Sequence, residues 1–144
     1  QPSIHCHSIN RGFYMLSSFR LIPIASVFFF GFILWIIVVS DMGGPNVLID
    51  SVRAIPYGDK FGHMGLYAVL ALLVNLSLKP RPQRYLGLPL GCALVLAFAL
   101  LEELSQYFFP STRMLDIQDA LADIVGVYLA AWVCSKLQMI ERNK

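Results

Sequence analysis

Residues 102–123, EELSQYFFPSTRMLDIQDALAD, hold five carboxylates and Arg113 in a chain that is otherwise sparsely charged. Apolar runs flank this stretch at residues 86–101 and 124–133. Charges at the ends of apolar segments are costly in a membrane and usually mark a functional site. Because Pro110 stops a helix, the stretch predicts two membrane helices joined by a charged connection.

The composition is that of an integral membrane protein. Hydrophobic residues make up 57% of the 144 residues and charged residues 14%, whereas soluble domains carry about 25% charged residues. The net charge of +2, with no basic face interleaved with aromatic residues, argues against nucleic-acid binding. Cys6, Cys92 and Cys134 have no metal-ligand spacing, and the last two lie in apolar runs, where cysteine usually packs.

Four apolar segments predict an all-α domain with four transmembrane helices. They cover residues 21–39, 61–78, 85–108 and 116–136. The first segment is long enough to cross about 30 Å of hydrocarbon, and Val39-Ser40-Asp41 is a poor signal-peptide cleavage site, so we expect a retained anchor. Glycine and proline residues predict loops at residues 41–58 and 79–84.

The length allows one domain, with a tail on either side. Residues 1–18 are polar and without periodicity, so we expect a flexible tail, in which Met15 is placed like a natural start. Residues 19–138 form the predicted four-helix domain, and residues 139–144 a short polar tail.

The distribution of charge predicts how the helices are oriented. With a cytoplasmic N-terminus, eight Lys and Arg residues lie on the inner side and three, Arg53, Lys60 and Arg113, on the outer side. This bias predicts that both termini are cytoplasmic. The polar motifs at residues 59–63, 102–106 and 116–123 would then share one depth near the outer face.

Helical spacing places the polar groups of each motif on one face. His63 follows Asp59 by four residues and Lys60 by three, and Gln106 follows Glu103 by three. Asp119 follows Asp116 by three residues and precedes Asp123 by four. Lipid cannot accept such faces, so we expect them to face one another or a water-filled cleft.

Some of these residues have a purely structural explanation. Asp59 and Asp116 stand where helices begin and are expected to act as N-caps. Asp119, in the first turn, would complement the helix dipole. Lys60 and Glu102 are long enough to extend to the membrane interface.

Capping does not explain His63, Glu103, Asp119 and Asp123, which lie roughly 6–10 Å inside their helices at about 1.5 Å per residue. A buried ion pair with Arg113 would make them structural. Between Asp59 and Asp123, the polar motifs contain six acidic residues and two basic residues. Either some of these carboxylates are protonated, or a cation binds at the site. A divalent metal is an alternative that we do not favour, because no dedicated pattern such as His-Glu-x-x-His occurs.

In order, these motifs resemble the pattern of the VanZ-like family of small bacterial membrane proteins. The pattern reads Asp-Lys-x-x-His, then Glu-x-x-Gln, then Arg, Asp, Asn and Gly at fixed spacing. The matching residues are Asp59, Lys60, His63, Glu103, Gln106, Arg113, Asp119, Asp123 and Gly126. The resemblance implies a four-helix membrane protein and a link to glycopeptide (teicoplanin) resistance.

The chain departs from the family pattern at Asp123, where the family usually has Asn. If Asp123 serves as a hydrogen-bond acceptor or a protonated acid, an Asn there should be tolerated. If its charge is required, a cation site built from Asp119 and Asp123 becomes the better interpretation.

The leading functional hypothesis is a non-enzymatic envelope protein. Its outward-facing polar cleft would bind an envelope lipid, a cell-wall precursor or a glycopeptide-like ligand through Asp59, Lys60, His63, Glu103, Gln106, Arg113, Asp119 and Asp123. The motivation is a polar cleft without a recognisable nucleophile–base arrangement. The bilayer is the other expected partner, in the cytoplasmic membrane of a bacterium.

The alternative is an intramembrane enzyme acting on an envelope lipid. His63 would act as the acid/base group, Glu103 or Asp119 as its partner, and Arg113 as an anion clamp. A transporter is a third class, which four spans would serve only through oligomerisation.

Overall fold

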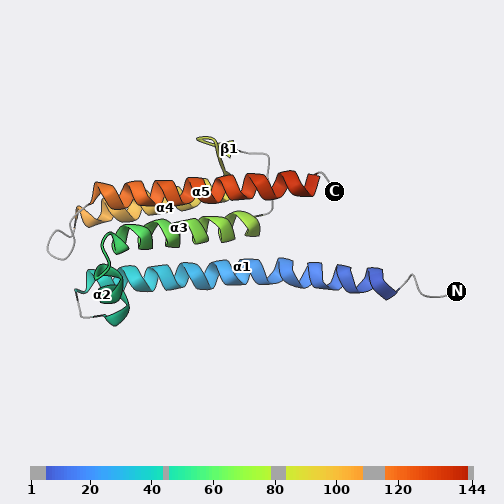
Figure 1. The fold of residues 1–144 in the computed structure, drawn as a ribbon, viewed down its shortest axis with the longest axis horizontal. Coiled ribbons are helices and arrows are strands. Elements are labelled where there is room, and N and C mark those ends of the chain that lie inside the picture. The colour runs from blue at the N-terminus through green and yellow to red at the C-terminus, as the bar shows by residue number, and fades with distance from the viewer. Residues whose placement is uncertain (1–5, 44–45, 79–83, 109–115, 143–144) are drawn as a thin grey trace.

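The computed structural model describes residues 6–43, 46–78, 84–108 and 116–142 (Figure 1). Within these ranges it contains five helices and one short hairpin, so the all-α class is confirmed. The elements are α1 (Cys6–Asp41), α2 (Val47–Arg53), α3 (Gly58–Ser77), β1 (Arg84–Tyr85), β2 (Leu88–Pro89), α4 (Leu90–Gln106) and α5 (Ile117–Arg142).

Helix α3 is the element against which the other long helices pack. It contacts α1, α4 and α5, while α4 and α5 also contact each other. Figure 1 shows the long helices running roughly parallel to one axis, with the start of α1 and the end of α5 at one end of the bundle. The short helix α2 lies at the other end, together with the start of α3 and the start of α5. Every predicted polar motif therefore falls near this second end.

Three of the long helices are long and apolar enough to cross a membrane: α1 over Leu21–Asp41, α3 over Gly58–Ser77 and α5 over Ile117–Ile140. Large apolar side chains are exposed on their outer faces, among them Phe28 at 77% and Trp132 at 61%. So much exposed apolar surface is unfavourable in water but favourable in contact with the hydrocarbon of a bilayer. These helices therefore contact membrane lipid.

Small side chains allow the helices to approach closely. The core between α3, α4 and α5 contains Ala71, Ala99 and Ala130, all at most 4% exposed. A Cβ atom on Gly91 would come within 2.4 Å of the Asn75 Cα atom, so only glycine fits at this crossing of α3 and α4. Close backbone contact is the main source of helix association in lipid, where the hydrophobic effect between helices is absent.

The cysteines predicted to pack in apolar runs do so. Cys92 and Cys134 are free thiols, 0% and 1% exposed. They lie in the same core as Val95 and Val127, on α4 and α5.

Two connections differ from the prediction. Residues 47–53, predicted to be loop, form α2, because Asn46 caps a short apolar run: its Oδ1 accepts hydrogen bonds from the backbone N–H groups of Leu48 at 3.0 Å and Ile49 at 3.3 Å. The predicted helix from residue 85 begins only at Leu90. Leu86 and Gly87 have φ angles of 55° and 78°, which form a tight hairpin turn between β1 and β2 instead.

Two helices are longer than predicted. Helix α1 begins at Cys6, within the segment expected to be a tail, and α5 continues to Arg142, beyond the predicted end at Lys136. Both predictions include only the apolar residues of the helix. In the structure, each helix continues into polar sequence at the end of the bundle opposite the polar motifs.

Candidate functional site

Lys60 joins the beginnings of α3 and α5. Its Nζ atom lies 3.0 Å from Asp59 Oδ2, 2.5 Å from Asp116 Oδ2 and 2.6 Å from Asp119 Oδ1. The Lys60 side chain is only 18% exposed. We expect Lys60 to extend to the membrane interface, but it forms ion pairs with three carboxylates instead, because folding brings the two helix ends together.

The two predicted N-caps have different outcomes. Asp116 precedes α5 and accepts a hydrogen bond from the Gln118 backbone N–H at 2.8 Å, so its capping role is confirmed. The Lys60 ammonium and this N–H group hold the pKa of the Asp116 carboxyl below its usual value. Asp59 is not a cap, because α3 begins at Gly58 and its capping position is Tyr57.

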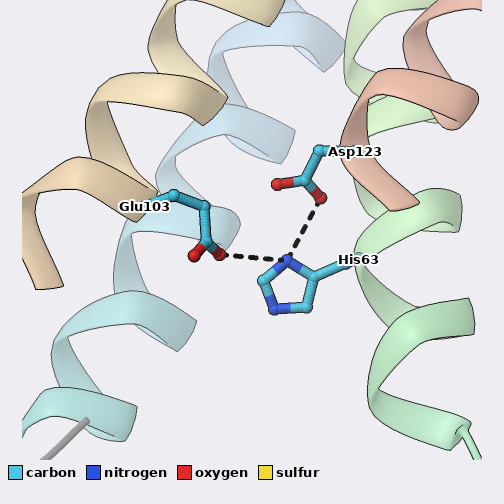
Figure 2. A group of neighbouring side chains, drawn as sticks. All are labelled: His63, Glu103 and Asp123. Carbon is cyan, nitrogen blue, oxygen red and sulfur yellow. Dashed lines mark hydrogen bonds and ion pairs between the residues drawn. The ribbon is translucent and has the colours of Figure 1, made fainter. Parts of the chain in front are cut away.

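His63 lies among carboxylates from two other helices (Figure 2). Its Nδ1 atom is 3.1 Å from Asp123 Oδ1 and 3.9 Å from Glu103 Oε1, and its Nε2 atom is 3.9 Å from Asp119 Oδ2. The closest carboxylate is thus that of Asp123, rather than either partner named for the enzyme hypothesis. Asp123 is 0% exposed and Glu103 is 3% exposed, so this cluster is buried between α3, α4 and α5.

Gln106 connects the two acids of α4. Its Nε2 atom donates to Glu102 Oε1 at 3.1 Å and to Glu103 Oε1 at 3.4 Å. Glu102, expected at the membrane interface, is instead only 7% exposed. Gln106 therefore fixes the orientation of the Glu103 carboxylate toward His63.

Two buried oxygen atoms in the cluster have no hydrogen-bond partner among the residues that the structure describes. They are Glu103 Oε2 and Asp123 Oδ2. An ionised carboxylate buried without full pairing is costly. The cluster around one imidazole therefore has excess acceptor capacity.

A cavity of about 530 Å³ adjoins the cluster. Its polar wall consists of side chains from α3, α4 and α5, among them His63, Glu102, Gln106 and Asp119. Its apolar wall comes from α1, α2 and α3, with Ile33, Ile37, Leu48 and Leu66. Arg53 of α2 is also part of the lining. The cavity thus combines an acidic wall with apolar walls.

The structure brings together seven of the eight predicted ligand-binding residues: Asp59, Lys60, His63, Glu103, Gln106, Asp119 and Asp123. Arg113 lies outside the described residues. Glu102 and helix α2 also line the cavity, although neither is predicted there from the sequence. Asn46 before an apolar run is nevertheless a recognisable helix start.

The helices and their polar interior define a helical integral membrane protein. A family comparison then gives the particular group: the VanZ/LLP1 family model matches residues 5–139, so the chain belongs to the VanZ/LLP1 family. No curated protein and no solved structure matches the chain.

Proposed function

We propose that this protein binds an amphiphilic ligand, an envelope lipid or a lipid-linked cell-wall precursor, in the cavity beside His63. The observation that carries the proposal is the pairing of one acidic wall with apolar walls in a single cavity of about 530 Å³. Ligand sites are mostly apolar with a few convergent polar groups, and their volumes fall in this range. A hydrocarbon chain would lie along Ile37 and Leu48, and the headgroup would face Asp119.

The chemistry of the acidic wall selects the kind of headgroup. Carboxylates accept hydrogen bonds and repel anions, so the wall favours hydroxyl, amide or amino groups, which abound in the sugars and peptides of cell-wall precursors. A glycopeptide-like ligand offers the same donors. Arg53 supplies a cation in the lining for an anionic group.

The proposed setting is the cytoplasmic membrane of a bacterium, with four spans and both termini inside. Helix α4, with 17 residues, would be the fourth span, at roughly 25 Å long. The excess of basic residues near the loop at residues 79–84 supports this orientation, which turns the cavity toward the outer face.

Cysteine labelling in intact cells tests the orientation. In a cysteine-free background, Ser51→Cys on α2 should react with an impermeant thiol reagent, whereas Tyr85→Cys on β1 should not. Both positions are exposed. Labelling of Tyr85→Cys alone would invert the proposed topology.

Ligand binding is tested with purified protein in nanodiscs and labelled envelope lipids. Leu48→Trp fills the apolar wall and should weaken saturable binding. Val47→Trp is the matched control, because Val47 is the neighbouring residue, is 85% exposed and is not part of the lining. Equal binding by the two variants would refute this cavity as the site.

A second function is favoured by the contact between His63 and Asp123 at 3.1 Å. An imidazole held by a carboxylate and facing a cavity can act as a general acid or base toward a bound lipid. Turnover of a labelled lipid that disappears in His63→Ala while binding persists would support an enzyme. Saturable binding without turnover would support the binder.

A further inference from the structure

We propose that His63, Glu103 and Asp123 form a binding site for one divalent metal ion. Each residue offers a ligand atom, and these atoms all lie within 4.8 Å of one another. Two ligands at about 2.1 Å from one ion can be roughly 4.2 Å apart, so at most a small side-chain rotation closes the site. The three ligands come from α3, α4 and α5, and Figure 2 shows all three directed into the same space.

The unsatisfied oxygens of the cluster independently indicate a ligand. Glu103 Oε2 and Asp123 Oδ2 are buried and lack a partner among the described residues, although both belong to side chains at most 3% exposed. One imidazole carries at most one positive charge, which two buried carboxylates exceed. A divalent ion would supply the missing positive charge and would give these carboxylates a partner.

The surrounding groups are those that orient metal ligands. With Nδ1 of His63 on the ion, Nε2 is left to donate its hydrogen, and Asp119 Oδ2 lies 3.9 Å away on that side. Metal-binding histidines usually donate their second N–H to a carboxylate, and a small movement of the Asp119 side chain would bring its carboxylate within hydrogen-bond distance. Gln106 plays the same supporting role for Glu103, to which it donates at 3.4 Å.

The ligand set narrows the identity of the ion. One imidazole nitrogen with carboxylate oxygens and no thiolate suits Zn²⁺, Mn²⁺ or Fe²⁺, whereas Ca²⁺ and Mg²⁺ prefer oxygen alone. Three protein ligands leave coordination positions open. Because His63 lines the cavity, an open position would be accessible from it. The inference does not depend on the proposed ligand binding.

Metal titration of the full-length protein in nanodiscs tests the site. The protein is first stripped with a chelator and then titrated with Zn²⁺ and Mn²⁺. The His5→Ala, Cys6→Ser, His7→Ala background removes the three consecutive side chains near the N-terminus that could bind a metal by themselves. We expect one ion per chain. Glu103→Gln and Asp123→Asn should each weaken binding by more than the roughly 10–100-fold that loss of an outer-shell partner costs. Asp50→Asn, the same change as Asp123→Asn at an exposed position of α2 outside the cavity lining, should leave the affinity within a few-fold of the starting value.

A spectroscopic measurement needs no variant in the cluster and so does not depend on its folding. In the Mn²⁺-loaded protein of this background, pulsed electron paramagnetic resonance should detect nitrogen coupling from one imidazole. Absence of saturable binding, equal effects of Asp50→Asn and Asp123→Asn, or bound Mn²⁺ without nitrogen coupling would each overturn the proposal. Leu48→Trp should leave metal affinity intact, which separates failure of this site from failure of the lipid cavity.

Discussion

Gly126 of α5 lies directly against the backbone of Met64 in α3. A Cβ atom at position 126 would come within 2.3 Å of the Met64 carbonyl oxygen, a distance that requires the helices to move. This crossing is three residues from Asp123 and one residue from His63, so it sets the separation of the two helices that hold the polar cluster.

The first prediction concerns this contact. Gly126→Ala should lower the free energy of unfolding by about 1–3 kcal/mol, as expected for overpacking. Gly65→Ala is the control, since a Cβ there meets nothing within 4 Å and alanine favours helix. The unfolding midpoints of the two variants are compared by thermal unfolding in detergent. Equal midpoints would contradict close packing of α3 and α5 at Gly126.

The second prediction concerns Lys60. Because Lys60 forms an ion pair with Asp119, which is 15% exposed, Lys60→Met should destabilise the protein by about 3 kcal/mol. A double-mutant cycle of Lys60→Met with Asp119→Asn should yield a coupling energy of at least about 1 kcal/mol. In the control cycle, which combines Lys60→Met with Asp50→Asn at an exposed position, the two losses of stability should be additive. If the losses are additive in both cycles, Lys60 and Asp119 are not energetically coupled.

The third prediction is a pH dependence. The pKa of Asp116 is lowered in the folded state, so its charge stabilises the fold above its ordinary pKa of 3.8, and this contribution is lost as the pH falls through the lower folded value. Asp116 is 40% exposed, so Asp116→Asn should cost at most about 1 kcal/mol at pH 7. The difference from wild type should vanish below the folded pKa; a difference that grows on acidification would contradict it.

The fourth prediction separates Asp123 from Asp119. In metal-free protein, Asp123→Asn should unfold at or above the wild-type midpoint, because it removes a buried carboxylate but keeps its shape. Asp119→Asn should unfold at a lower temperature than wild type, because it loses the charge of its ion pair with Lys60.

Adding metal should reverse the order of the unfolding midpoints of wild type and Asp123→Asn. An ion at 100 times its dissociation constant stabilises the folded state by about 2.7 kcal/mol. Wild type should gain this stability on addition of Zn²⁺, and Asp123→Asn should gain far less. Equal gains would exclude Asp123 as a ligand, and a poorly folded metal-free Asp123→Asn would show that its charge is structurally required.

The sequence predicts the helices well because hydrocarbon requires long apolar runs. It also predicts that the motifs of Lys60, His63 and Glu103 converge, since all lie at helix ends. It does not predict that His63 is closest to Asp123, because that depends on the rotation of each helix about its axis. The sequence also predicts too early a start for α4, because the run from Tyr85 is apolar. In the structure, Leu86 and Gly87 have positive φ angles and form a hairpin turn, which hydropathy does not predict.

The attachment of α1 has a consequence for how a ligand reaches the cavity. A hydrogen bond between Ser26 and Ser77 at 2.8 Å joins α1 to the far end of α3, away from His63. Beside the cavity, α1 presents Ile33 and Ile37. Apolar contacts of this kind are replaced at little cost by lipid tails. If the proposed amphiphilic ligand binds in this cavity, its hydrocarbon chain would therefore enter laterally from the bilayer, between α1 and the neighbouring helices, without passing through water.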